Sequence, residues 1–118
     1  MFNFEKLDVW QKAIDFADLV YASTRTFPTD ERFGLTNQIR RAAVSISSNI
    51  AEGCSRSSKA DFGRFVEIAT GSVFEVVSQA FIGRRQGFLS ESGFVSLYRG
   101  AEEQSKMLSG LKKSLLPD

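Results

Sequence analysis

Polar side chains recur at spacings of three or four residues along one segment in the first half of the chain. The set comprises Gln38, Arg41, Ser45, Asn49 and Glu52. On a helix this spacing places the side chains in one continuous stripe beside the apolar face. The stripe could line a ligand cleft or the central channel of a ring. We favour a hydrogen-bonded ladder that fixes the register between helices or subunits.

Cations gather in and after the same segment. They are Arg40, Arg41, Arg56, Lys59 and Arg64, with Glu52 and Asp61 among them. Repeated around a ring, such a patch could contact the phosphates of RNA or DNA. The alternative is a solvated rim whose local ion pairs contribute little individually. These five residues are therefore the candidate nucleic-acid-binding residues.

The residue types needed for most catalytic sites are missing. Histidine is absent, and Cys54 is the single cysteine. These counts exclude zinc fingers, thiol redox pairs and the Ser-His-Asp or Cys-His nucleophile groups. There is also no phosphate-binding loop and no dinucleotide-binding fingerprint. The sequence therefore predicts a protein that is not an enzyme, with no catalytic residues, no metal and no cofactor.

Length and composition are those of an ordinary globular domain. The chain has 118 residues, of which 42% are hydrophobic and 25% charged, so we expect one domain over residues 1–118. A net charge of +1 gives no overall attraction to nucleic acid. We find no signal peptide and no apolar run long enough to span a bilayer. The expected location is cytoplasmic, without a membrane partner.

Four stretches show helical periodicity. They cover approximately residues 9–27, 35–53, 59–86 and 91–116. Asp8, Ser58 and Ser90 are expected to cap the first, third and fourth stretches, and Gly53 to end the second. Short joints make consecutive helices antiparallel neighbours. The predicted fold is all-α, an up-down-up-down antiparallel four-helix bundle.

The first and third stretches carry more apolar side chains than one core can cover. In the first, the predicted core face contains Trp10, Ala13, Ile14, Ala17, Val20, Tyr21 and Thr24. In the third it contains Phe62, Phe65, Val66, Ala69, Val73, Val76 and Ala80. Small domains always expose some apolar area, but an exposed surface of this size more often marks an interface. We therefore expect a homo-oligomer, and the candidate interface residues are Phe16, Leu19, Phe74, Val77, Phe81 and Phe88.

Several strings resemble the bacterial four-helix-bundle family named after proteins encoded in intervening sequences of 23S ribosomal RNA. The strings are LDVWQKAIDFADLVY, FGLTNQIRRAAVSISSNIAEG, RSSKADFGRFVEIATGSVFEV and GFLS. The resemblance runs from about Leu7 to Leu115 and is most specific from Gly34 to Gly53. It implies four-helix protomers assembled as a homopentameric ring. A related branch, the accessory proteins of diversity-generating retroelements, binds nucleic acid and a reverse transcriptase. Those proteins are markedly basic, whereas this chain has a net charge of +1.

Two functions follow as expectations. The first is a non-enzymatic oligomeric scaffold or adaptor, a homopentamer that presents a repeated surface to RNA, DNA or a protein. The alternative is a nucleic-acid-binding protein that uses the basic residues around the ring. Neither the partner nor the pathway can be read from the residues.

Overall fold

The computed structural model describes residues 1–117, so only Asp118 of the predicted domain lies outside it. Four α-helices make up most of the chain: α1 (Asp8–Ser23), α2 (Leu35–Cys54), α3 (Lys59–Arg85) and α4 (Glu91–Ser114). Two short 3-10 helices, η1 (Asn3–Lys6) and η2 (Thr29–Glu31), precede α1 and α2. Residues 1–117 contain no β-strand. The predicted all-α class is confirmed.

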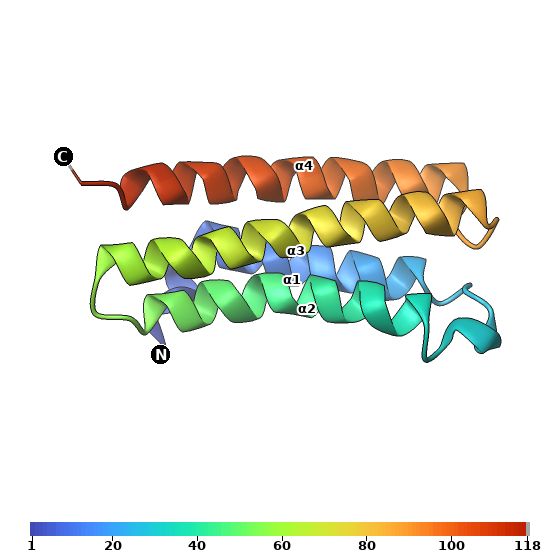
Figure 1. Cartoon of the computed structure of the whole chain (residues 1–118), viewed down its shortest axis with the longest axis horizontal. Coiled ribbons are helices and arrows are strands. Elements are labelled where there is room, and N and C mark those ends of the chain that lie inside the picture. The colour runs from blue at the N-terminus through green and yellow to red at the C-terminus, as the bar shows by residue number, and fades with distance from the viewer. Residues whose placement is uncertain (118) are drawn as a thin grey trace.

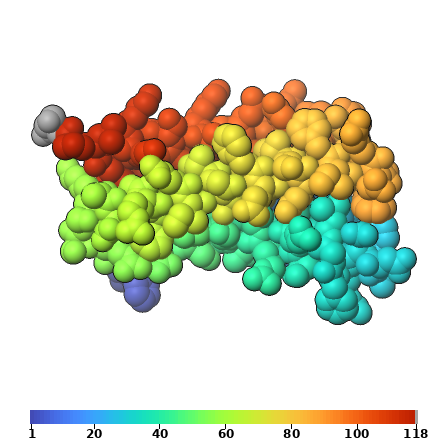
Figure 2. All heavy atoms as spheres, in the orientation of Figure 1, coloured from blue at the N-terminus to red at the C-terminus, as the bar shows by residue number. Residues whose placement is uncertain are grey.

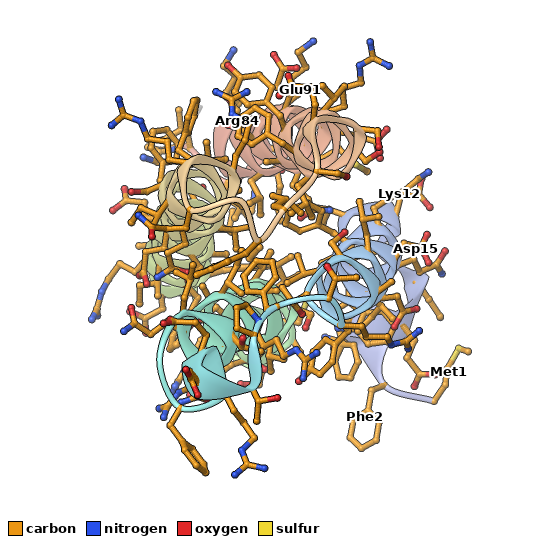
Figure 3. All side chains as sticks on the ribbon, turned by 90° about the vertical axis from the view of Figure 1, so that its right-hand side faces the viewer. Met1, Phe2, Lys12, Asp15, Arg84 and Glu91 are labelled. Atoms are coloured by element: carbon orange, nitrogen blue, oxygen red, sulfur yellow. The ribbon has the colours of Figure 1, made fainter. Side chains whose placement is uncertain are left out.

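The helices lie side by side and run in alternating directions (Figure 1). Helix α1 packs against α2 and α4, and α3 packs against the same two helices. Seen from one end, the four helices therefore surround a shared core, with α1 diagonally opposite α3 (Figure 3). The molecule measures 47 × 22 × 20 Å. This is the four-helix bundle that the short joints predict.

Two of the three predicted N-terminal caps are present. Ser58 Oγ accepts a hydrogen bond from the Asp61 N–H at 3.1 Å, and Ser90 Oγ accepts one from the Gly93 N–H at 3.0 Å. The prediction for Asp8 is wrong, because Asp8 is the first residue of α1 and Leu7 precedes it without a side-chain cap. An acidic residue in the first turn still favours the helix through its dipole.

Gly53 does not end α2, contrary to expectation, because the helix continues to Cys54. The glycine is instead required by packing. A Cβ at this position would lie 2.8 Å from Phe62 Cδ1 and 3.0 Å from Phe65 Cβ. Both rings, predicted to be core residues, are partly buried, and they cover the end of α2 that Gly53 leaves open.

The core side of α1 agrees with the predicted one only in part: Ala13, Val20 and Thr24 are buried as predicted. The buried residues of α1 are Val9, Ala13, Phe16 and Val20, whereas Ile14 and Tyr21 are exposed. Phe16 is only 4% exposed, and its ring lies where a side chain on Gly100 of α4 would otherwise be. The prediction that Phe16 leaves the core is therefore wrong. Beside this core side lies a second apolar stripe, in which Ile14 and Tyr21 are exposed and Trp10 and Ala17 are partly buried against the core.

Helix α3 is unusually apolar. By length and composition alone it could cross a membrane, whereas the sequence analysis found no apolar run of that length. One such helix is weak evidence for a membrane protein. Its buried side chains include Val66, Ala69, Val73, Val76 and Ala80, as predicted. Only 33% of its most apolar window is buried in the bundle. Much apolar surface of α3 therefore lies outside the core.

The contact between Phe16 and Gly100 can be tested with a pair of glycine variants. A Cβ at Gly100 would lie 2.8 Å from the buried Phe16 ring, whereas a Cβ at Gly110 on the same helix meets no atom within 4 Å. We expect Gly110→Ala to raise the free energy of unfolding by about 0.5–1 kcal/mol, through helix propensity. Gly100→Ala should lower it by about 1–2 kcal/mol, because overpacking outweighs that gain.

Urea unfolding followed by circular dichroism, at one protein concentration for all variants, measures both changes. If both variants are stabilised equally, Phe16 does not pack against Gly100 as described.

Candidate functional site

Part of the polar stripe on α2 forms a ladder to α3. Asn49 Nδ2 donates to the carbonyl oxygen of Ser45 at 2.8 Å and to Ser45 Oγ at 2.9 Å. The hydroxyl of Ser72 on α3, which has one proton to donate, lies 2.9 Å from Ser45 Oγ and 3.2 Å from the Ile68 carbonyl oxygen. These partly buried bonds join the two helices at one level. Ser72 is the partner that the sequence did not reveal, because a lone serine in an apolar helix gives no signal.

The remaining stripe residues have other surroundings. Gln38 and Arg41 line a groove of about 370 Å³ between α2 and α3, together with Glu75 and Gln79. Gln79 Oε1 is buried there without a hydrogen-bond partner. Glu52 turns away and binds Arg56 at 2.9 Å. The groove thus presents a cation, a carboxylate and amide groups along the outside of the bundle.

The five candidate cations do not form one patch. Arg40 and Arg41 lie in the first half of α2, whereas Arg56, Lys59 and Arg64 surround the joint to α3. Fifteen residues separate Arg41 from Arg56, which is about 22 Å along a helix. The cations therefore form two groups, one on α2 and one around the joint between α2 and α3.

Three of these cations also have partners inside the chain. Arg40 Nε donates to Thr24 Oγ1 at 2.8 Å, and its guanidinium lies 4.7 Å from the centre of the Tyr21 ring. Arg56 pairs with Glu52 and lies 4.6 Å from the Phe65 ring. Arg64 lies 3.5 Å from Asp61. Arg41 and Lys59 form no ion pair within residues 1–117.

An apolar surface covers the outer side of the α3–α4 pair. We define the α3–α4 surface by Phe74, Val77, Phe81 and Tyr98, which line a hollow of about 380 Å³. Phe74 is 66% exposed, and Phe81 and Tyr98 are each 40% exposed. The Phe81 ring lies 4.8 Å from the Phe94 ring and 6.4 Å from the Tyr98 ring. Three predicted interface residues thus come together here with Tyr98, one turn after the core residue Phe94.

The other predicted interface residues lie elsewhere. Phe88 is partly buried, and its ring lies 5.8 Å from that of Phe27. Leu19 is partly buried and packs against the core beside Phe16 and Gly100. Neither contributes to the α3–α4 surface.

A second apolar surface lies on the α1–α2 pair. We define the α1–α2 surface by Trp10, Ile14, Tyr21 and Val44. Ile14, Tyr21 and Val44 are exposed, and Trp10 is partly buried. Because the helices alternate around the core, this surface and the α3–α4 surface are on opposite sides of the bundle (Figure 3). The sequence assigned three of these four residues to the core because their spacing is helical.

The single thiol has the environment of a structural cysteine. Cys54 is partly buried at the end of α2, and its carbonyl oxygen accepts a hydrogen bond from Asn3 Nδ2 at 3.1 Å. Burial raises the pKa of the Cys54 thiol, so the neutral thiol is favoured near pH 7. Within residues 1–117, no cluster of three or more cysteine, aspartate or glutamate side chains could hold a metal ion.

Comparison with known proteins identifies the family. A crystal structure of a protein of unknown function from Bacteroides thetaiotaomicron, of the S23 ribosomal protein family, has the same fold, with a TM-score of 0.79. The two are 25% identical, and the match covers 89% of this chain and 98% of that one. No curated protein matches the sequence. The profile of the 23S rRNA-intervening sequence proteins matches residues 5–110. The chain therefore belongs to the family of 23S rRNA-intervening sequence proteins.

Proposed function

We propose that this protein is a non-enzymatic scaffold that works as a closed ring of identical subunits. One observation carries the proposal: two different apolar surfaces lie on opposite sides of the bundle. Exposed aromatic and branched side chains of this extent favour association. When two different surfaces of one subunit bind each other head to tail, the result is a ring if the rotation closes. Five subunits is the number that the family resemblance implies.

The two surfaces lie at matching levels along the bundle. The Phe16 ring rests on Gly100, which places these residues of α1 and α4 side by side. With a rise of about 1.5 Å per residue, Tyr98 then lies at a level between Ile14 and Tyr21. A head-to-tail contact between surfaces at one level needs no shift along the bundle axis. Such a contact supports a closed ring rather than an open filament.

Charges beside the two surfaces are complementary. Glu102 lines the hollow of the α3–α4 surface and forms no ion pair within residues 1–117. Arg40 and Arg41 line a hollow next to Tyr21 and Val44 of the α1–α2 surface. Opposite charges across an interface fix its register and exclude wrong pairings. Glu102 of one subunit would face these arginines of the next.

Contact through these surfaces leaves the polar α2–α3 groove uncovered in every subunit. Gln38, Glu75 and Gln79 of the groove would then be repeated around the ring. A repeated polar groove is what a scaffold offers to a partner, because several weak contacts together bind strongly. Nucleic-acid binding stays a prediction. Its candidate cations would be repeated around the ring as two groups in each subunit.

Phe74→Ser tests the interface, with Ile68→Ser as its matched control. Both residues are exposed on α3, 66% for Phe74 and 50% for Ile68, but only Phe74 belongs to the α3–α4 surface. Burying a phenylalanine contributes about 2 kcal/mol per contact. Phe74→Ser should therefore raise the concentration of half-dissociation more than tenfold. Ile68→Ser should leave it unchanged.

Light scattering coupled to size exclusion, over a range of concentrations, measures the mass. The chain weighs 13.1 kDa, so a pentamer would weigh about five times as much. A 13.1 kDa species at micromolar concentration in the wild type, or equal loss of mass in both variants, contradicts the proposal.

A charge exchange tests the pairing of the surfaces. Glu102→Arg should weaken assembly about tenfold, because it places like charges opposite each other across the contact. Adding Arg41→Glu to the same chain should restore most of the lost affinity, whereas Arg41→Glu alone should also weaken it. Sedimentation of the single and double variants gives the coupling. Additive losses in the double variant would show that the two residues do not meet.

A further inference from the structure

The N-terminal segment holds aromatic rings outside the bundle in a fixed position. Phe2 is 72% exposed, and its ring stacks on that of Phe4 with 5.8 Å between centres. The Phe4 ring lies 4.8 Å from that of Trp10. The Phe2 N–H donates to Glu5 Oε2 at 2.7 Å, and Asn3 binds the end of α2. Figure 2 shows the segment projecting from the lower edge of the molecule.

A hollow of about 380 Å³ lies between the start of α3 and the end of α4. Ala60, Gly63, Leu115, Leu116 and Pro117 form its apolar walls. An apolar cavity of roughly 150 Å³ is enough to hold a benzene ring. Lys112 Nζ lies 2.7 Å from Glu67 Oε1, and this hydrogen bond and charge lower the pKa of the Glu67 carboxyl. Lys112 and Glu67 thus pair with each other, whereas Lys59 and Arg64 add positive charge to the lining, and a cation beside apolar walls favours the face of an aromatic side chain.

The N-terminal aromatic segment and the hollow lie at the same level along the bundle axis but on different sides of the bundle. Asn3 is bonded to the carbonyl oxygen of Cys54 at the end of α2, and α3 begins at Lys59 after a short joint. Both features therefore lie at the same end of the bundle. Phe2, however, points out from the α1–α2 side (Figure 3), whereas the hollow lies between α3 and α4. The fixed rings of one chain do not reach the hollow of the same chain.

We propose that Phe2 of one subunit occupies the α3–α4 end hollow of the neighbouring subunit. The inference rests on the proposed ring, because it continues the same pairing of the α1–α2 side with the α3–α4 side. A second copy is the occupant that the geometry favours, since its rings arrive at the level of the hollow without a shift along the axis. Lys59, on the rim, adds a cation beside the inserted ring.

Disulfide trapping tests the contact directly. In a Cys54→Ala background, Phe2→Cys is combined with Leu116→Cys, which lies in the hollow and is exposed. A disulfide requires Cα atoms within about 4.4–6.8 Å. We expect mild oxidation to give a ladder of covalent multimers that ends at the size of the ring. Phe2→Cys with Ile68→Cys, outside the hollow, is the control and should give no ladder.

Gel electrophoresis of the oxidised variant, together with light scattering, distinguishes failure of the Phe2 contact from failure of the proposed ring. Multimers in light scattering without cross-links leave the ring intact and overturn the Phe2 contact, with the hollow left to another partner. A cross-linked monomer overturns it as well, because the segment would then reach its own hollow. Cross-linked dimers alone overturn the head-to-tail arrangement. A monomer in scattering for the wild-type chain overturns the ring itself.

A side-chain deletion provides a second measurement. Phe2→Ser should raise the concentration of half-dissociation about tenfold, because it removes a buried ring from each contact. The control is Phe33→Ser, since Phe33 is also highly exposed but lies in the joint before α2, at the other end of the bundle. Equal dissociation of both variants overturns the contact of Phe2 with the hollow.

Discussion

A four-helix bundle buries one side of each helix, and α3 carries apolar side chains on more than one side. Its core side packs Val66, Val73 and Val76 against the other helices. Phe74 and Phe81 extend beside that side, toward α4 and solvent. No rotation of α3 could bury both sets in a single bundle. The excess therefore has to be exposed or covered by another molecule, and the proposed assembly would cover it.

The same constraint explains where reading the sequence succeeded and where it did not. Helix positions followed from periodicity, and the caps at Ser58 and Ser90 followed from local chemistry that depends on neighbouring residues alone. The core side of α1 could not be found that way. Val9, Ala13, Phe16 and Val20 have helical spacing, and so does the stripe of Trp10, Ile14, Ala17 and Tyr21. Only the partner helix decides between them, because Gly100 provides the space for the Phe16 ring.

The residues of the candidate site could be predicted from the sequence better than the way in which they come together. The polar stripe on α2 was visible from spacing, but its partner Ser72 comes from a distant position in α3. The basic residues looked like one cluster because they are close in sequence. Each residue of a helix advances the chain by about 1.5 Å along the helix axis, so Arg41 and Arg56 lie at different levels along the bundle. Arg40 turns toward Thr24, directly after α1, instead of joining Arg41.

Packing inside the subunit also sets the geometry of contacts outside it. Phe16 on Gly100 fixes the level of α1 against α4, and the Ser45–Ser72 bond fixes α2 against α3. These two contacts determine how the α1–α2 surface stands relative to the α3–α4 surface. In a head-to-tail ring, an error in that relation repeats at every subunit, so a small shift along the axis would open the ring into a helix. In the proposed ring, the small residues at these helix contacts would serve closure of the ring as well as packing within the subunit.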